Sequence, residues 1–305
     1  TMALVLVNPH AQGGRVRRRL PAIVQALHAL TPLPRWQAPE TLEEALDVLL
    51  HEPEGARVVL VGGDGTVNRY LPALLLRRLQ MGLVPLGSGN DLARALGLNR
   101  RDWRQALADA LHGRVRPMDT GLVVWSDARG DGHRTPFASS LTCGFDAAVG
   151  RRALQGPRWL SGLPRYLWAT LAECHALQHY RAHGEVDGQP LPPGPWLFRS
   201  VLNTPTYGSG LPATPEARID DGWLNGLHAG PFGRLGTLRM LPTLMRGEHL
   251  RHPLVRTQPL RELVLHGETP LPLAADGEWL GHAQLLRVSV QAASLPVARA
   301  EPVAG

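Results

Sequence analysis

Residues 58–68 read Val-Val-Leu-Val-Gly-Gly-Asp-Gly-Thr-Val-Asn. The four apolar residues predict a buried parallel strand, and the residues from Val67 to Leu79 predict a helix with Thr66 as its N-cap. The three glycines between them allow positive φ and a close approach of the backbone to a bulky anion. Because a helix start presents free N–H groups and a positive dipole end, this segment predicts a phosphate cradle built from backbone.

This cradle is not a Walker A loop, because that loop requires a Gly-Lys-Ser/Thr sequence and the segment contains no lysine. Asp64 adds a carboxylate beside the expected phosphates, where a magnesium ion or its waters would bridge the two. A tight strand-to-helix turn without a ligand is the alternative, and residues 58–68 alone leave it open.

The composition indicates a soluble globular protein. Of the 305 residues, 44% are hydrophobic and 19% are charged, which allows two domains of ordinary size or one large domain. The net charge of +6 favours anionic partners such as nucleotide phosphates or acidic lipid headgroups. No basic stripe with interleaved aromatic residues is present in the sequence, so nucleic acid is not expected as a partner.

Cysteine content and hydropathy indicate where the protein works. Two cysteines, Cys143 and Cys174, are too few for a disulfide framework and fit a reducing cytoplasm. The sequence has no run of 18 apolar residues, so any membrane contact is expected to be peripheral.

Two further strand-loop-helix units flank the first. Residues 3–7 predict a strand and residues 15–30 a helix, and Asn8 in the loop between them either hydrogen-bonds a nucleotide or fixes its own turn. Residues 82–91 hold a second glycine loop, in which Asn90 or Asp91 is expected to cap a helix over 92–98 and Ser88 offers a hydroxyl. Because ligands of α/β folds sit at the carboxyl ends of the strands, both glycine loops are expected to converge on one nucleotide.

The pattern changes near residue 120. Helices are also expected over 41–51 and 102–111, and the chain beyond them is rich in short strands separated by Gly, Pro and Asp turns, which predicts an antiparallel sandwich or barrel. The expected strands are residues 122–125, 137–143, 196–202, 224–229, 260–265 and 285–291.

Residues 157–183 form an exception with a helical pattern. Leu163, Leu167 and Leu171 recur at four-residue spacing, so they either pack on the sheet or belong to a helix at a membrane surface, where the neighbouring Arg, Trp and Tyr residues suit the headgroup layer. His175, His179 and His183 share one face of this expected helix, so zinc binding is a further hypothesis.

Several motifs together resemble a known family. In chain order they are Asn8-Pro9, Gly62-Gly63-Asp64-Gly65-Thr66-Val67-Asn68, Pro85-Leu86-Gly87-Ser88-Gly89-Asn90-Asp91, Cys143-Gly144-Phe145-Asp146-Ala147, Tyr207-Gly208-Ser209-Gly210, Pro215-Glu216-Ala217, Asp220-Asp221-Gly222 and Asp276-Gly277-Glu278. Over nearly the whole chain they resemble the diacylglycerol kinase catalytic-domain family of lipid kinases, particularly its bacterial soluble members. The first glycine block is shared with NAD kinases and sphingosine kinases, whereas the second block and the late Asp-Gly-Glu narrow the resemblance to lipid kinases.

The resemblance implies an α/β nucleotide-binding domain over residues 1–120 and a mostly antiparallel β-sandwich domain for the lipid over 121–289. The active site would lie in the cleft between the domains, and the tail at about 290–305 is expected to return to the first domain. ATP would contact Asn8, Gly63, Asp64, Gly65, Thr66, Val67, Asn68, Ser88, Asn90 and Asp91.

The resemblance also implies the catalytic and metal residues. Asp276 matches the family's general base and Glu278 would orient the base or the magnesium, although Asp-Gly-Glu taken alone is typical of a turn between strands. Asp221 matches an acidic ligand of a structural Mg²⁺ site, with backbone carbonyls of Arg218 and Trp223 as its neighbours.

The expected activity is an ATP- and Mg²⁺-dependent transfer of phosphate to a lipid hydroxyl, in the cytoplasm at the inner face of the membrane. A kinase of a soluble substrate, such as NAD or a polyol, and a catalytically silent nucleotide- or lipid-binding module are the rival hypotheses. Arg69 and Gln12, which stand where the family usually has Glu and Gly, favour the silent module; Trp36 or Gln37 stands where a nucleotide-contacting Thr is common. The sequence leaves a homodimer open.

Overall fold

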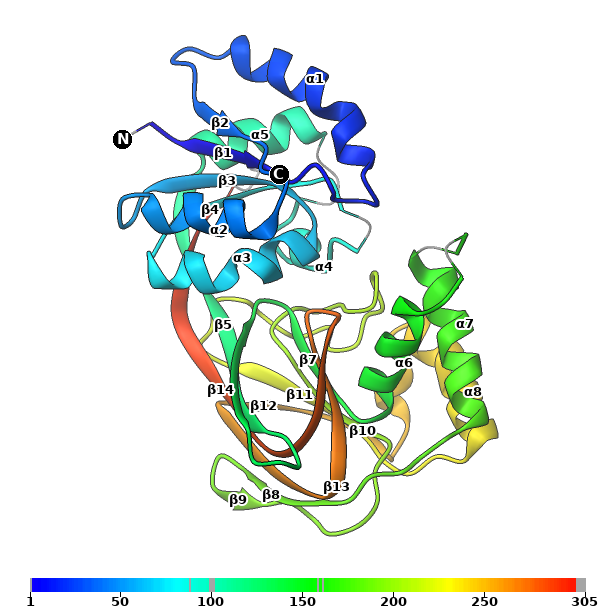
Figure 1. Ribbon diagram of the computed structural model, residues 1–305. Coiled ribbons are helices and arrows are strands. Elements are labelled where there is room, and N and C mark those ends of the chain that lie inside the picture. Colours follow the sequence, from blue (N-terminus) through cyan, green and yellow to red (C-terminus); the bar gives the residue numbers. More distant parts are fainter. Residues whose placement is uncertain (1, 88, 99–101, 158, 161, 300–305) are drawn as a thin grey trace. The chain divides into compact units, whose positions relative to one another are not determined.

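A computed structural model describes residues 2–87, 89–98, 102–157, 159–160 and 162–299. It divides into two compact units, shown in Figure 1. Unit 1 comprises Thr1–Met118 and Ala293–Gly305, and unit 2 comprises Asp119–Ala292. The predicted fold class is confirmed, because unit 1 is an α/β domain and unit 2 is a sandwich built mostly from antiparallel strands.

Unit 1 is built on a parallel sheet. Its strands in spatial order are β2 (Arg35–Gln37), β1 (Leu4–Val7), β3 (Arg57–Gly62) and β4 (Gln80–Pro85), and Val297 of β14 pairs with Met81 of β4. The helices are α1 (Arg15–His28), α2 (Leu42–His51), α3 (Asp64–Leu76), α4 (Asp91–Ala95) and α5 (Trp103–His112). Every residue of β1 is buried, because helices cover both faces of a parallel sheet. Val5 and Val59 pack with α1 and α5 on one of these faces.

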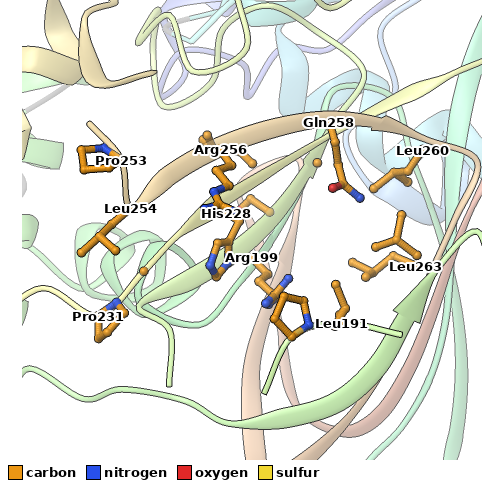
Figure 2. Close-up of a pocket in the computed structure, with 16 residues that line it drawn as sticks. Leu191, Arg199, His228, Pro231, Pro253, Leu254, Arg256, Gln258, Leu260 and Leu263 are labelled. Atoms are coloured by element: carbon orange, nitrogen blue, oxygen red, sulfur yellow. The ribbon is translucent and has the colours of Figure 1, made fainter. Parts of the chain in front are cut away.

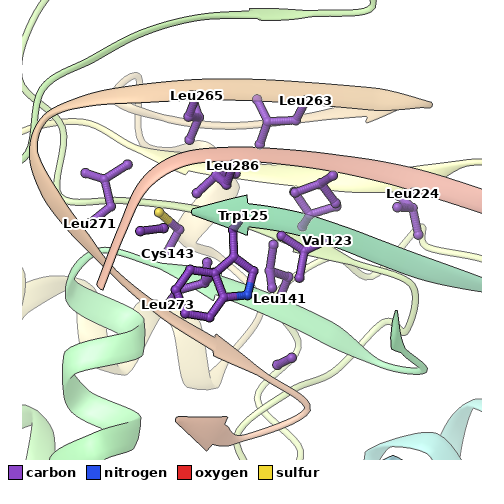
Figure 3. Packing of buried hydrophobic residues seen from close by; sticks show 14 of the residues in the cluster. Val123, Trp125, Leu141, Cys143, Leu224, Leu263, Leu265, Leu271, Leu273 and Leu286 are labelled. Atoms are coloured by element: carbon purple, nitrogen blue, oxygen red, sulfur yellow. The ribbon is translucent and has the colours of Figure 1, made fainter. Parts of the chain in front are cut away.

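Unit 2 contains the remaining strands and three helices. Its strands are β5 (Arg114–Ser126), β6 (Gly132–Phe137), β7 (Ser140–Cys143), β8 (Ala182–Val186), β9 (Gln189–Pro190), β10 (Phe198–Leu202), β11 (Leu224–Ala229), β12 (Val255–Leu260), β13 (Glu262–Ala275) and β14 (Glu278–Arg299), of which β5 and β14 extend into unit 1. The path β12-β11-β10-β7-β13-β14 is antiparallel, and β8 pairs with β13. Val123, Trp125, Leu273 and Leu286 are among the side chains that fill the core between the strands (Figure 3).

The helices of unit 2 cover one face of β10 and β11. They are α6 (Phe145–Leu154), α7 (Gly162–His175) and α8 (Arg234–Met245), and the short 3₁₀ helix η1 (His249–Arg251) lies beside α8. Successive side chains of β10 and β11 point to opposite faces of the sheet. Leu202 and Leu227 therefore pack under the helices, while Val201 packs in the sandwich core.

The predicted helix boundary at the first glycine loop is wrong. Helix α3 begins at Asp64 and ends at Leu76, and its N-cap is Gly63, not Thr66. Gly63 is extended (φ −124°, ψ −167°), so the chain already turns into the helix there, and Thr66 lies buried inside the first turn. The hydroxyl of Thr66 therefore bonds to another loop and not to its own helix.

Two predictions for unit 2 are also wrong. The helix expected over 157–183 ends at His175, because Tyr180 pairs its backbone with Trp196 and His183 belongs to β8. The three histidines therefore share no helical face, and the described part of the chain contains no group of three or more metal-ligating side chains. The single strand expected over 137–143 is two strands, β6 and β7, since Ala138 and Ser139 turn their amides toward Asp276.

Among the described residues, the structure has no helix that is both long and apolar enough to cross a lipid bilayer.

Candidate functional site

The two glycine loops of unit 1 touch through their backbones. A Cβ added to Gly63 would come within 2.6 Å of the Cα of Gly87, and a Cβ added to Gly87 would collide with Gly63 in return. Only glycine at both positions permits this approach, which brings together the carboxyl ends of β3 and β4. The two glycine loops are therefore in contact in the structure, and their binding of one nucleotide stays a prediction.

Asn8 joins a third loop to this pair. Its side-chain amide donates a hydrogen bond to the hydroxyl of Thr66 at 2.8 Å, and its carbonyl oxygen accepts from the backbone N–H of His10 at 3.0 Å. Gly62 makes room for the Thr66 side chain, because a Cβ on Gly62 would collide with that hydroxyl. Both readings of Asn8 remain compatible with this geometry, since its side chain fixes its own turn and also lies at the carboxyl edge of the sheet.

Acidic side chains hold the second glycine loop in place. Asp64 accepts the backbone N–H of Asp91 at 2.6 Å, and Asp91 forms an ion pair with Arg94 at 2.9 Å. Arg94 also donates to the carbonyl oxygen of Gly89 at 2.8 Å. Asn90 occupies the N-cap position of α4 with φ 54°, but its amide donates to the carbonyl of Gly87 and caps no helical N–H. Helix α4 is correspondingly shorter than predicted.

The other residues predicted to contact the nucleotide differ in burial and in whether their backbone amides are already hydrogen-bonded. The side chain of Val67 is 1% exposed and its N–H, like that of Thr66, bonds to the carbonyl of Gly63, so neither amide is left for a phosphate. Gly65 and Asn68 are half-buried on α3, whose start carries no side-chain cap among the described residues. Ser88 lies outside the described residues. Gln12 adopts φ 54°, a conformation that explains why glycine suits this position.

Asp276 lies in unit 2, in the turn between β13 and β14. Asp276 and Gly277 both have positive φ, at 48° and 82°, as the type I′ turn of a two-residue hairpin requires. One carboxylate oxygen accepts the N–H of Ala138 at 2.8 Å, and the other accepts those of Ser139 at 2.7 Å and Ser140 at 2.9 Å. The carboxylate is thus fixed in orientation, and Glu278 is the first residue of β14.

A second Asp-Gly hairpin in unit 2 allows a comparison. Asp187 and Gly188 join β8 to β9 with φ of 48° and 76°, and one oxygen of Asp187 accepts the N–H groups of Arg261 and Glu262. Amide binding by the turn aspartate is therefore a structural device that this fold uses twice. Asp276 differs because both of its oxygens are engaged and it is half-buried.

The predicted metal residues lie in a tight acidic turn before β11. Asp221 accepts the N–H of Trp223 at 3.0 Å, Arg218 contacts Asp220 at 3.4 Å, and the buried Asp119 accepts the N–H of Gly222 at 2.7 Å. One carboxylate and nearby carbonyl oxygens are hard donors that fit Mg²⁺. The sequence analysis did not single out Asp119, although its carboxylate supports this turn.

Comparison with known proteins identifies the family. Residues 2–123 match the family model described as "Diacylglycerol kinase catalytic domain", and residues 139–299 match "YegS C-terminal NAD kinase beta sandwich-like domain". The chain belongs to the diacylglycerol kinase family.

Relatives and solved structures agree with this placement. The chain is 31% identical over 223 residues to "Diacylglycerol kinase" of Mycobacterium tuberculosis, which covers 73% of this chain and 70% of that protein. It is 29% identical over 303 residues to "Probable lipid kinase YegS-like" of Pseudomonas aeruginosa, covering 96% and 92%. A diacylglycerol kinase structure from Bacillus anthracis has a TM-score of 0.74 at 19% identity, over 100% of this chain and 98% of that one. Yeast NADH kinase has a TM-score of 0.57 at 11% identity, covering 99% and 84%, so it too shares the fold.

This diacylglycerol kinase family member also contains a buried acid, Asp146, which the sequence analysis quoted within a motif but to which it gave no role. Asp146 on α6 is 5% exposed and accepts hydrogen bonds from Ser200 at 3.1 Å and Tyr207 at 3.0 Å. Burial raises the pKa of Asp146 to about 7, against the two hydrogen bonds, which lower it. Its sequence signals are its place in the Cys143–Ala147 motif and its position as a single acid among mostly apolar residues.

Proposed function

We propose that this chain transfers the γ-phosphoryl group of ATP to the hydroxyl group of a diacylglycerol-like lipid. The observation that carries the proposal is the mutual backbone contact of Gly63 and Gly87, in a chain that belongs to the diacylglycerol kinase family. Two loops with no side chain between them present backbone N–H groups at their surface. Such a surface suits a ligand that is bound by backbone groups, such as a polyphosphate.

The proposal assigns the nucleotide to unit 1. The N-terminus of α3, with Gly65 and Asn68, would receive the phosphates, and the bond from Asn8 to Thr66 would hold the loops in register. Thr66 and Val67 would act by packing, because their amides are already used within the turn. Asp64 and Asp91 would position the second loop and not contact the phosphates directly.

The acceptor hydroxyl is assigned to Asp276 in unit 2. A carboxylate within hydrogen-bond reach of the hydroxyl takes its proton as the phosphoryl group transfers. The amides of Ala138, Ser139 and Ser140 support this role by fixing the direction of both oxygens. Glu278 follows at the start of β14 and would orient the same group.

Two Mg²⁺ roles belong to the proposal. Bound with ATP, Mg²⁺ would neutralise phosphate charge, and Asp64 in the first turn of α3 would hold the ion or its waters. A structural Mg²⁺ would be held by the Asp221 carboxylate with the carbonyl oxygens of Arg218 and Trp223, where it would tie the turn before β11.

A peripheral contact with the inner face of the cytoplasmic membrane completes the proposal. Trp159, between α6 and α7, is 82% exposed, and Leu171 on α7 is 57% exposed, so the leucines at four-residue spacing do not all pack on the sheet. Ala169, Thr170 and Cys174 form the buried side of α7 instead. Exposed Trp and Leu beside arginine suit the headgroup layer of a bilayer.

The test is ADP release with Mg²⁺ and ATP across a panel of lipids in mixed micelles, with NAD and a polyol as soluble acceptors. Turnover by wild type is compared with turnover by Asp276→Asn. Vesicle co-sedimentation is compared between Trp159→Ala and Leu76→Ala, which truncates a side chain of unit 1 that is 73% exposed.

Turnover on a diacylglycerol that Asp276→Asn abolishes supports the proposal. Turnover only on NAD or the polyol replaces it with a soluble-substrate kinase. ATP binding without turnover on any acceptor replaces it with a silent binding module. Equal sedimentation of Trp159→Ala and Leu76→Ala contradicts the membrane contact at α6 and α7.

A further inference from the structure

Unit 2 contains a cavity of about 270 Å³ that the proposed kinase site does not use. Figure 2 shows its floor, formed by β10, β11 and β12, and its surroundings at Leu191 and Leu263. Leu263 lies near the start of β13, whereas Asp276 follows the end of that strand. The cavity and the Asp276 carboxylate are therefore at opposite ends of β13.

Three nitrogen-bearing side chains form a row across the floor of this cavity. Arg199 of β10 pairs in register with His228 of β11, and His228 pairs with Arg256 of β12. Residues directly opposite one another on adjacent strands point to the same face of a sheet, and neighbouring strands lie about 5 Å apart. The two guanidinium groups therefore flank one imidazole on the face that lines the cavity.

No carboxylate balances this row within the described part of the chain, where neither Arg199 nor Arg256 has an acidic partner. The Arg199 guanidinium lies 5.6 Å from the centre of the Trp196 ring. Its Nε and the Nδ1 of His228 are buried and make no hydrogen bond to any described group. Two buried nitrogen atoms without described partners are costly, so apolar packing alone does not explain why this polar row lies here.

The charge state of the row follows from its surroundings. Burial lowers the pKa of Arg199 to about 10, so this side chain stays charged at neutral pH. Burial, with repulsion from Arg199 and Arg256, lowers the pKa of His228 to about 4, so the imidazole is neutral and presents one N–H donor. The floor thus offers two positive charges and at least three donors to a single anion.

Apart from Ser200 and Gln258, the side chains that line the rest of the cavity are apolar. These apolar lining residues include Leu191, Pro231, Pro253 and Leu254. Leu254 is 42% exposed at the surface. A small inorganic ion would leave this apolar surface uncovered, whereas the first carbons of a chain attached to the anion would cover it. The cavity therefore suits an amphiphile better than a free ion.

We propose that this cavity binds the phosphate monoester headgroup of a single-chain amphiphile, held by Arg199, His228 and Arg256. A phosphate monoester carries nearly two negative charges at neutral pH and three terminal oxygens, which match two guanidinium groups and an imidazole N–H. A carboxylate has one charge and two oxygens, so it satisfies the row less completely. This site is separate from the acceptor site assigned to Asp276, and it does not depend on kinase activity.

The test is calorimetric titration of the whole chain with dodecyl phosphate below its micelle concentration, without ATP. Arg256→Gln removes an exposed guanidinium and is expected to fold normally, and Arg199→Gln removes the half-buried one. Arg134→Gln is the matched control, because Arg134 is an exposed arginine of unit 2 on β6, away from the cavity. Inorganic phosphate, dodecanoate and dodecyl maltoside test the two halves of the ligand.

Dodecyl phosphate is expected to bind with one site per chain, and Arg256→Gln to weaken it about tenfold or more because a charge-assisted hydrogen bond is lost. Arg134→Gln should leave the Kd unchanged. An unchanged Kd in Arg256→Gln overturns the proposal. If inorganic phosphate binds as tightly as dodecyl phosphate, the ligand need not be an amphiphile and that part of the proposal is overturned. If dodecanoate or dodecyl maltoside binds as tightly, the requirement for a phosphate headgroup is overturned.

Discussion

The side-chain amide of Asn8 donates a hydrogen bond to the hydroxyl of Thr66, at 2.8 Å and across 58 positions of sequence. Asn8 follows β1 and Thr66 lies in the first turn of α3 after β3. Because β1 and β3 are paired in parallel, this bond ties together two loops at the same edge of the sheet. Thr66 does not cap α3, because the helix has already begun at Asp64, and its hydroxyl accepts from another loop instead.

The first prediction concerns this bond. Asn8→Ala should destabilise the protein by about 1–2 kcal/mol, because the Thr66 and His10 contacts are both lost. Urea unfolding of Asn8→Ala, Thr66→Val and the double variant should give a coupling energy of about 0.5–1.5 kcal/mol. Additive effects in this cycle would mean that the two side chains do not support each other.

The second prediction concerns the contact between the glycine loops. Gly63→Ala should weaken ATP binding about tenfold or more, because its Cβ must push Gly87 away from a separation of 2.6 Å. Gly150→Ala is the control: Gly150 lies in α6 with no atom within 4 Å of the added Cβ. Calorimetry with ATP checks both variants, and normal affinity in Gly63→Ala would contradict the phosphate cradle.

The third prediction separates the catalytic and structural roles of Asp276. Asp276→Asn should reduce kcat about 100-fold or more with little change in ATP affinity. It should also lower stability by about 1–3 kcal/mol, because the new NH₂ group meets one of three backbone donors. Asp187→Asn is the control, since its single accepting oxygen can be kept and its activity should be normal. A normal kcat in Asp276→Asn would leave the residue with a structural role only.

The fourth prediction concerns the buried Asp146 carboxyl. Its pKa is raised from 3.8 to about 7 in the folded state, so its contribution to stability is complete below pH 3.8. The contribution declines as the pH rises to about 7, because the unfolded carboxyl ionises while the folded one stays protonated. Relative to Asp146→Asn, wild type should lose up to about 4 kcal/mol of unfolding free energy over this range. Parallel pH profiles of the two proteins, from urea unfolding, would show that Asp146 does not titrate this way.

The fifth prediction concerns the acidic turn before β11. Mg²⁺ at millimolar concentration should raise the Tm of wild type by about 2–4 °C, because a ligand that binds only the folded state stabilises it. Asp221→Ala should lose this increase, whereas Asp220→Ala, which removes the neighbouring acid, should retain it. Differential scanning fluorimetry with Mg²⁺ and with EDTA measures the effect without reference to activity. An equal Tm increase in Asp221→Ala would place the metal elsewhere.

Local patterns were sufficient for most of the fold. Residues 58–62 read as a buried strand because helices cover both faces of a parallel sheet, and the strand over 224–229 has the boundaries that its turns indicate. The glycine loops were also recognisable from the sequence, because the need for glycine is a property of the backbone at each position. The two-domain class followed from the change from helical to strand periodicity near residue 120.

Where local patterns failed, a distant partner had intervened. The helical pattern through His183 was overridden at Tyr180, whose backbone pairs with Trp196. The cap expected at Thr66 is absent because α3 begins at Asp64, and the Thr66 hydroxyl accepts from Asn8 instead. In both cases a hydrogen bond from elsewhere in the chain replaced the one that the neighbouring sequence would have made.

The amino-acid sequence alone determined the fold class, the family and the residue types of the candidate site, because periodicity, turn chemistry and motif spacing are local properties of the chain. Only the tertiary structure decided which groups meet. The register of β10, β11 and β12 aligns Arg199, His228 and Arg256, and the hairpin turn brings Asp276 to amides about 138 positions away. Strand register depends on packing of the whole sheet, and a one-residue shift would turn each of these side chains to the opposite face.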